Sequence, residues 1–277
     1  MCGIVAIYNK EIILDSDMRS KSLMMSKKVR HRGPDWSGIY TSDHAILAHE
    51  RLSIVDVKSG KQPIISNNDE IILAVNGEIY NHKSIRKDKN FKYDYKTESD
   101  CEVIIPLYEK IKSDLLNELS GIFAFFLYDK VSNSFLVGRD PVGVIPLYMG
   151  FGDDGKKYFA SEMKCLVGVC SNIKEFPPGH YMTDKDEAPV KYYQRNWMSS
   201  EKLKNYTSTS DLRDSLEKSV KSQMMSDVPF GVLLSGGLDS SIISSIVTKF
   251  SKHRIESGDK KKAWWPRIHS FAVGLEN

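Results

Sequence analysis

The hydrophobic pattern of the chain changes near residue 196, and this change constrains the fold more than any other feature. Before it, short apolar runs are bounded by glycine, asparagine, aspartate or proline, which predicts β-strands. After it, the order becomes helix, short apolar strand, glycine loop, helix and strand, which is typical of the opening of a parallel α/β unit. We therefore expect two domains, residues 1–196 and 211–277, with a tail and linker reaching about residue 210. The predicted strands of the first domain are Gly3–Tyr8, Ala45–Arg51, Ile71–Asn76, Ile122–Asp129, Phe135–Arg139 and Tyr158–Ala160.

Two helical patterns interrupt the strands of the first domain. Met18–Val29 places apolar residues on a polar background, and Asp100–Lys112 gathers its apolar side chains near one face. Pro106 lies inside the second pattern, so we expect a kink there or a place in the first helical turn. Strands arranged around two helices predict stacked sheets covered by helices, which is a four-layer α+β domain.

The composition excludes several classes of protein. A net charge of +3 is too small to indicate a nucleic-acid partner. No run approaches the ~18 consecutive apolar residues of a membrane span. Lys10 and Glu11 follow only a short mixed segment, so we expect no signal peptide and a cytoplasmic protein. Cys101, Cys165 and Cys170 lack C-x-x-C spacing, so we expect reduced core residues rather than disulfides or metal ligands.

Cys2 directly follows the initiator methionine and precedes the first predicted strand. Because methionine is usually removed ahead of a small residue, Cys2 would then carry both a thiol and a free α-amino group. A thiol attacks only as thiolate, and with a pKa of ~8.5 little of it is ionised at neutral pH. An α-amine with a pKa of ~7.7–8.0 can take that proton, so one residue supplies nucleophile and base. The alternative is a small buried side chain at a strand start.

A second chemical motif lies between the predicted strand Gly231–Leu234 and the predicted helix Ile242–Phe250. Two glycines in the loop Ser235–Ser241 let the backbone approach an anion, and the helix start offers unpaired N–H groups. Asp239 could hold a magnesium ion against phosphate oxygens. The loop lacks the lysine of a P-loop and resembles the pyrophosphate loop of ATP pyrophosphatases, which split ATP between the α and β phosphates. A further strand is predicted at His269–Gly274.

An N-terminal Cys-Gly-Ile and this loop on one chain resemble asparagine synthetase of the glutamine-hydrolysing type. The resemblance implies an N-terminal-nucleophile glutaminase, a four-layer αββα sandwich, followed by the truncated start of a parallel-sheet ATP-pyrophosphatase domain. It implies that Cys2 releases ammonia from glutamine, and that ATP-dependent amidation of aspartate proceeds through β-aspartyl-AMP with AMP and pyrophosphate released. The matching stretches are Arg30–Asp35, Arg51–Asp56, Asn76–Asn81, Ser99–Glu102, Gly138–Pro141, Pro146–Tyr148, Ala160–Glu162 and Leu233–Ser241.

The resemblance also implies roles for individual residues. The side-chain amide of Asn76 and the backbone N–H of Gly77 would form the oxyanion hole, which suits preorganised donors. Arg51 would bind the α-carboxylate of glutamine and Asp100 its α-ammonium group. The other residues of the implied glutamine pocket are Leu52, Ser53, Ile54, Val55 and Glu78. The implied ATP-binding residues are Leu233 and Val273 at the adenine ring, and Ser235, Gly236, Gly237, Asp239 and Ser240 at the phosphates.

Several of these residues have another interpretation when taken alone. Asn76-Gly77 after an apolar run is a hairpin-turn pattern, Asp100 could be a helix N-cap, and Arg51 could be a surface arginine. The histidines at positions 31, 49 and 82 invite a cysteine–histidine mechanism, but an α-amine base makes them unnecessary, so we interpret them as structural or peripheral. By resemblance, Arg30–Asp35 would form a flap over glutamine.

Two other functional hypotheses remain open at this point. One is a different amidotransferase, β-lactam-forming or phosphoribosyl-transferring, and the other is a non-enzymatic interaction module. Under the synthetase hypothesis, ATP and Mg²⁺ serve the full-length enzyme, the glutaminase step needs no cofactor, and the partners are small molecules with a homodimer possible. Because the second domain spans only residues 211–277, we expect this chain to hydrolyse glutamine without making asparagine.

Overall fold

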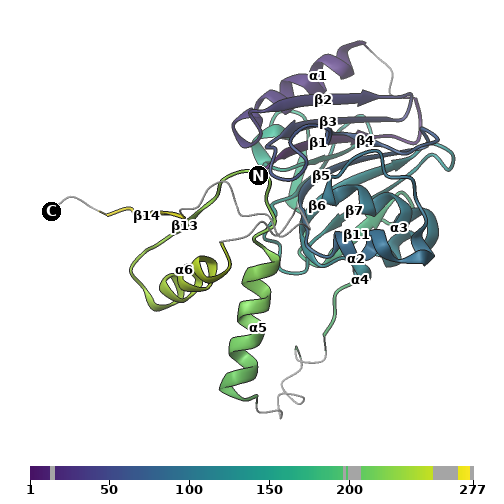
Figure 1. The fold of residues 1–277 in the computed structure, drawn as a ribbon. Helices are drawn as coiled ribbons and strands as arrows, with labels where there is room; N and C mark the ends of the chain where they lie inside the picture. Colours follow the sequence, from purple (N-terminus) through teal and green to yellow (C-terminus); the bar gives the residue numbers. More distant parts are fainter. Residues whose placement is uncertain (13–15, 196–197, 199–206, 252–267, 275–277) are drawn as a thin grey trace. The chain divides into compact units, whose positions relative to one another are not determined.

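The structure is a computed structural model, shown in Figure 1, that describes residues 1–12, 16–195, 198, 207–251 and 268–274. The chain forms two compact units, Met1–Gln194 and Arg195–Asn277. Within the described residues, no helix is long and apolar enough to cross a membrane.

The first unit contains two six-stranded sheets, and the first sheet has the strand order β10-β8-β9-β1-β3-β2 with antiparallel neighbours. At its centre, β1 and β3 are buried along their whole length, because both faces of this sheet are covered. Their register pairs Gly3 with Glu50, so Cys2 comes next to Arg51. The strands are β1 (Gly3–Tyr8), β2 (Trp36–Thr41), β3 (Ala45–Arg51), β8 (Tyr148–Phe151), β9 (Lys157–Ala160) and β10 (Asn172–Glu175).

The second sheet is antiparallel as well and has the strand order β12-β11-β7-β6-β5-β4. Its longest pair, β5 with β6, runs in register from Ile71–Asp129 to Ile79–Gly121. On the other edge of β5, the strand β4 is only two residues long. The strands are β4 (Ile64–Ile65), β5 (Ile71–Ile79), β6 (Gly121–Asp129), β7 (Ser134–Arg139), β11 (His180–Thr183) and β12 (Val190–Lys191).

Helices cover the outer face of each sheet of this unit (Figure 1). They are α1 (Ser16–Lys27), α2 (His82–Lys87), α3 (Ile104–Ile111) and α4 (Leu115–Glu118), with 3-10 turns η1 (Arg30–Arg32), η2 (Lys89–Phe91), η3 (Asp100–Val103), η4 (Lys112–Asp114) and η5 (Met163–Cys165).

Three buried apolar clusters define the layers. Because successive side chains of a strand point to opposite faces, Ile4 and Ala6 of β1 pack between the sheets with Ala74 of β5, whereas Val5 packs with Met25 of α1. The odd-numbered residues of β5, Leu73 and Val75 among them, pack with α3. The order of layers is helix, sheet, sheet, helix, which confirms the predicted four-layer α+β sandwich.

The structure decides two expectations about local structure, one at Asn76-Gly77 and one at Pro106. The interpretation of Asn76-Gly77 as a hairpin turn is wrong, because β5 continues through both residues to Ile79 and Gly77 pairs with Phe123. Glycine is needed at 77 because a Cβ there would lie 2.2 Å from the backbone oxygen of Ile122. Pro106 lies in the first turn of α3, directly after η3, where a missing N–H costs least.

The second unit consists of α5 (Thr209–Ser222), β13 (Gly231–Leu233), α6 (Leu238–Phe250) and β14 (His269–Phe271). The strands β13 and β14 form the predicted parallel pair. Ser208 and Asp211 form a reciprocal capping box that starts α5. The helix α6 begins at Leu238, earlier than predicted, so Asp239 and Ser240 lie in its first turn rather than in a loop.

Candidate active site

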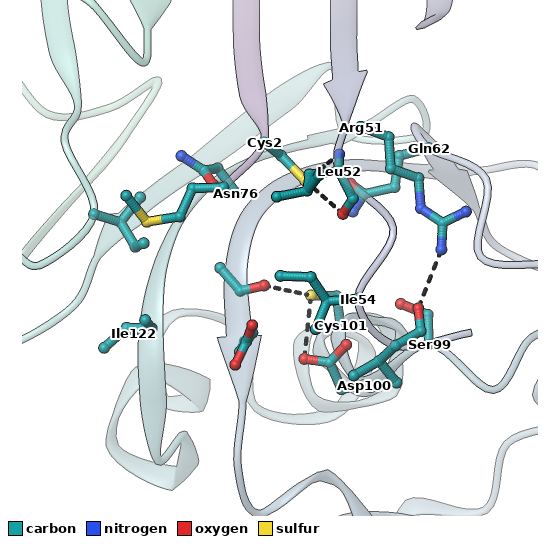
Figure 2. Close-up of a pocket in the computed structure, with 15 residues that line it drawn as sticks. Cys2, Arg51, Leu52, Ile54, Gln62, Asn76, Ser99, Asp100, Cys101 and Ile122 are labelled. Carbon is teal, nitrogen blue, oxygen red and sulfur yellow. Dashed lines mark hydrogen bonds between the residues drawn. The ribbon is translucent and has the colours of Figure 1, made fainter. Parts of the chain in front are cut away.

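A pocket in the first unit gathers most of the residues that the sequence predicts for a glutamine site (Figure 2). It lies where β1 begins, where β3 ends and along the later part of β5. The lining residues are Met1, Cys2, Arg51, Leu52, Ile54, Val55, Gln62, Asn76, Gly77, Glu78, Ser99, Asp100, Cys101, Ile122 and Ile145. Of the predicted glutamine-binding residues, Ser53 alone does not line this pocket; its backbone N–H donates to the Asp35 carboxylate at 2.8 Å.

The alternation of strand residues brings Cys2 and Asn76 together. Even-numbered residues of β1 and β5 face the space between the sheets, and Cys2 and Asn76 continue these two rows into the pocket. The Cys2 sulfur accepts the backbone N–H of Leu52 at 3.3 Å and lies 3.6 Å from the Leu52 carbonyl oxygen. Burial raises the pKa of the Cys2 thiol, although the Leu52 backbone and the nearby chain terminus oppose this. The thiol therefore needs a base to become a nucleophile at neutral pH.

The chain terminus beside this thiol is a candidate base. Partial burial lowers the pKa of the Met1 amine, and the positive charge of Arg32 lowers it further. A larger fraction of this amine is therefore unprotonated at neutral pH than in an exposed terminus. Removal of Met1 would transfer the terminal amine to Cys2 itself.

An ion-pair cluster holds the backbone of Cys2. The Nε of Arg32 donates to the Cys2 carbonyl oxygen at 2.9 Å, and its Nη1 pairs with Glu162 at 3.0 Å. Lys164 and His31 pair with the same carboxylate at 2.8 and 3.0 Å. Partial burial alone would raise the pKa of Glu162, but hydrogen bonds from Lys164 and Arg32 outweigh it and lower the pKa to about 2. Glu162 thus stays ionised at neutral pH, and its pairing with Arg32 helps to fix the start of β1.

Asn76 is the most unusual side chain of the pocket. It is completely buried, yet neither its amide nitrogen nor its amide oxygen has a hydrogen-bond partner within the described residues. Buried polar atoms are almost always paired, so an orphaned amide facing a thiol suggests a partner from a ligand. The neighbouring Gly77 presents backbone rather than a side chain to the same pocket.

Arg51 and Asp100 give the pocket one cation and one anion, and both are buried. The interpretation of Arg51 as a surface residue is wrong: its Nη2 donates to the carbonyl oxygens of Val55 and Asp56 at 3.1 and 2.6 Å, which folds the following loop around the guanidinium. Asp100 is not an N-cap either, since Ser99 holds that position. Its Oδ2 accepts the Ile79 N–H at 2.7 Å and so joins η3 to the end of β5.

The three histidines considered for a cysteine–histidine mechanism do not line the pocket. His49 is fully buried between the sheets; burial lowers its pKa to about 4, so the ring is neutral at physiological pH. His82 is buried at the start of α2, and His31 contacts Glu162. The segment that contains His31 is tied to the pocket loop, because the Asp35 N–H donates to the Arg51 carbonyl oxygen at 3.0 Å.

In the second unit, the predicted phosphate loop turns through Gly236, which has a positive φ of 85°. Nothing lies within 4 Å of a Cβ built on Gly236, so the space above this backbone is open. The hydroxyls of Ser235 and Ser240 lie 3.0 Å apart across the start of α6. Leu233 and Val273 are both strongly exposed. Asp239 is the one acid in the first turn of α6, and no group of three or more His, Cys, Asp or Glu side chains suited to a metal occurs in the described part of the chain.

Comparison with known proteins identifies the family. The family model described as a glutamine amidotransferase domain matches residues 1–174, and the one described as asparagine synthase matches residues 211–277. The chain belongs to the glutamine amidotransferase family. It is 53% identical to asparagine synthetase B [glutamine-hydrolyzing] of Escherichia coli (strain K12) over 99% of its length, and 48% identical to a probable asparagine synthetase [glutamine-hydrolyzing] of Dictyostelium discoideum over 100%. These alignments cover 50% and 51% of the two relatives, so the chain spans about half of their length.

Solved structures agree on the fold. A glutamine phosphoribosylpyrophosphate amidotransferase from B. subtilis, complexed with ADP and GMP, matches with a TM-score of 0.56 at 21% identity, covering 90% of this chain and 64% of that one. A structure described as the allosteric regulatory enzyme of purine biosynthesis matches with a TM-score of 0.58 at 21% identity, covering 88% and 62%. At this identity the likeness concerns the fold alone. The predicted resemblance to glutamine-hydrolysing asparagine synthetases is confirmed by the sequence relatives.

Sequence reasoning missed several residues of this pocket. Ser99 and Cys101 flank Asp100 and line the pocket. Both lie in the stretch Ser99–Glu102 that matches the family, so the sequence could have indicated them as neighbours of the site. Ile122 and Ile145 are apolar residues without a distinguishing pattern. Gln62 stands in an ordinary Lys-Gln-Pro segment, and only the tertiary structure shows that its side chain enters the pocket wall.

Proposed function

We propose that the first unit hydrolyses glutamine to glutamate and ammonia with Cys2 as the nucleophile. The observation that carries this proposal is the buried, unpartnered amide of Asn76 facing the Cys2 thiol from the opposite sheet. A thiol opposite an unused hydrogen-bond donor is the arrangement that attack on an amide carbonyl requires.

The proposed chemistry begins with removal of Met1, which places a free α-amine on Cys2. This amine takes the thiol proton, the sulfur bonds to the side-chain amide carbon of glutamine, and the carbonyl electrons move onto oxygen. The Asn76 amide and the Gly77 N–H stabilise that oxyanion, each at about 3–4 kcal/mol. The amine then returns the proton to the leaving nitrogen, ammonia departs, and water hydrolyses the thioester to glutamate.

Substrate binding would use the two buried charges. The Arg51 guanidinium, already held by two carbonyl oxygens, would bind the α-carboxylate of glutamine. Asp100 would accept the α-ammonium group, with Glu78 close by in the same pocket. The loop of Leu52, Ser53, Ile54 and Val55 would lie along the carbon chain of the substrate, where Leu52, Ile54 and Val55 line the pocket. Arg30–Asp35, hydrogen-bonded to this loop, would cover it.

The names of the relatives, asparagine synthetases, suggest that the ammonia would be used to make asparagine. The proposed route is ATP-dependent amidation of aspartate through β-aspartyl-AMP. In the second unit, Ser235, Gly236, Gly237, Asp239 and Ser240 would bind pyrophosphate, and Leu233 and Val273 the adenine. A magnesium ion fits this loop as a companion of ATP, because Asp239 supplies one carboxylate and the phosphates supply the other oxygens. The proposal includes a reducing, cytoplasmic location, which suits four free cysteines, and possible homodimers.

Glutamate release from glutamine by the purified chain tests the glutaminase proposal, with intact mass reporting whether Met1 is absent. We expect activity in the trimmed protein, and its loss in Cys2→Ala. Cys170→Ala is the matched control, since this cysteine does not line the pocket. A diazoketone analogue of glutamine should alkylate the Cys2 peptide in the wild type. Persistent hydrolysis by Cys2→Ala would refute the nucleophile assignment.

A further inference from the structure

The strand β5 loses its neighbouring strand just before the proposed oxyanion hole. Backbone groups of alternate residues point to the same edge of a strand, so Ile71, Leu73, Val75, Gly77 and Ile79 share the edge opposite β6. The short strand β4 covers this edge at Leu73, and Ser66 covers it at Ile71. No strand of the described chain continues β4 along Val75, so the backbone there must find other partners.

Two buried side chains take the place of the missing strand at Val75. The Gln62 Oε1 accepts the Val75 N–H at 2.7 Å, and the His49 Nε2 lies 2.8 Å from the Val75 carbonyl oxygen. Because a carbonyl oxygen only accepts, His49 donates from Nε2–H. Burial lowers the pKa of His49 to about 4, so the ring that donates at neutral pH is the neutral Nε2–H tautomer. Gln62 also lines the pocket beside Arg51 (Figure 2), and His49 reaches across from β3 in the other sheet.

We propose that Gln62 and His49 are positioning residues. By holding the Val75 peptide, they orient the Asn76 amide and the Gly77 N–H, which form the proposed oxyanion hole. The inference rests on the proposed glutaminase function. The side chain of Asn76 has no hydrogen bond of its own within the described residues. Its orientation therefore depends on the position of its own backbone. Pairing with β6 holds one edge of that backbone, and Gln62 and His49 hold the other.

The same edge explains the place of Gly77. Ile79, two residues beyond, donates its N–H to the Asp100 carboxylate, and Val75, two residues before, donates to Gln62. Gly77 therefore points its N–H to this edge between two fixed neighbours. A misplacement of about 1 Å costs about a hundredfold in rate, so both neighbours matter for a donor that must meet an oxyanion.

Kinetics of Gln62→Met test the proposal, because methionine keeps the shape and removes the acceptor. We expect kcat for glutamine hydrolysis to fall about a hundredfold, while KM changes little because Arg51 and Asp100 are intact. An aldehyde analogue of glutamine, whose hemithioacetal with Cys2 puts an oxygen into the hole, should lose affinity by a similar factor. Binding of glutamate, which forms no such adduct, should stay the same. Ser66→Ala removes an edge contact at a residue that does not line the pocket, and it should leave kcat unchanged.

A double-mutant cycle with Asn76→Ala separates positioning from general destabilisation. If Gln62 acts through Asn76, the Gln62→Met change should cost clearly less when Asn76 is already alanine, because only the Gly77 N–H is then left to be misplaced. Equal losses in both backgrounds, or an unchanged kcat and aldehyde affinity in Gln62→Met, would overturn the proposal. If Gln62→Met does not fold, the same cycle with His49→Gln, which keeps a donor at the Nε2 position, and His49→Leu, which removes it, decides the matter.

The proposed function and this inference fail in different ways. A wild-type chain without Met1 that does not hydrolyse glutamine would refute the function. An active wild type with an inactive Cys2→Ala variant, combined with additive effects in the cycle, would refute the positioning role alone.

Discussion

At the scale of single residues, Asn76 carries a cost in stability that its proposed role in the oxyanion hole would explain. Its buried amide makes no hydrogen bond within the described residues, so burying it costs folding free energy. We predict that Asn76→Ala lowers kcat for glutamine hydrolysis about 10²- to 10³-fold, the usual loss of one oxyanion donor. The same change should leave the free energy of unfolding equal or higher, because it removes an unsatisfied buried group. Steady-state kinetics and denaturant unfolding measure the two effects.

Asn81 offers the opposite control for this prediction. Its side chain donates to the Glu118 carbonyl oxygen at 2.8 Å and accepts the Ser120 N–H at 2.9 Å, and it lies outside the pocket. Asn81→Ala should therefore lower the free energy of unfolding by about 1 kcal/mol and leave kcat unchanged. A clear loss of stability in Asn76→Ala with full activity would mean that its amide is structural.

At the scale of elements, β5 shows what local sequence can and cannot predict. The strands Gly3–Tyr8 and Ala45–Arg51 were predicted with their observed bounds, since long apolar runs report burial directly. The pair Asn76-Gly77 led to a wrong prediction because a turn and the close approach of a neighbouring strand both favour glycine. Only the opposite strand, with the Ile122 oxygen against Gly77, distinguishes them. A two-residue strand such as β4 is too short to show an alternating hydrophobic pattern. The unpaired edge of β5 beyond it, and the contact that Gln62 makes there, could therefore not be predicted.

The close approach of β6 to Gly77 leads to a second prediction. A Cβ there would lie 2.2 Å from the Ile122 oxygen and 2.6 Å from the Phe123 Cα, and both contacts are backbone that cannot move aside cheaply. Gly77→Ala should push β5 from β6, lower the free energy of unfolding by about 2 kcal/mol or more, and abolish measurable glutaminase activity. Thermal unfolding and kinetics provide the readout.

Gly155 is the matched glycine for this test. It has a φ of 75°, but nothing lies within 4 Å of a Cβ built there. Gly155→Ala should therefore cost only the backbone strain, about 1–2 kcal/mol, with kcat unchanged. If Gly77→Ala were no worse than Gly155→Ala in stability and activity, a steric clash with the backbone of β6 would not explain why residue 77 is glycine.

At the scale of the whole molecule, the two units differ in how many buried apolar residues each contains. All three buried apolar clusters, and every residue of the pocket, come from Met1–Gln194. In the described part of the second unit, the buried apolar side chains are Met224, Met225, Ile246 and Val247. Other large apolar side chains of this part are exposed, among them Leu212, Leu233, Leu238 and Phe271. A unit with its own complete core is expected to fold alone.

We therefore predict that a chain ending at Gln194 folds and hydrolyses glutamine with kcat within about threefold of the 277-residue chain, less than 1 kcal/mol in the barrier. The reason is that the proposed nucleophile and each proposed substrate contact belong to the first unit. Thermal unfolding followed by near-ultraviolet circular dichroism and glutamate release would measure folding and activity together. A shortened chain that folds with the same transition but is inactive would show that the second unit contributes to the glutamine site, which the four-layer sandwich alone does not require.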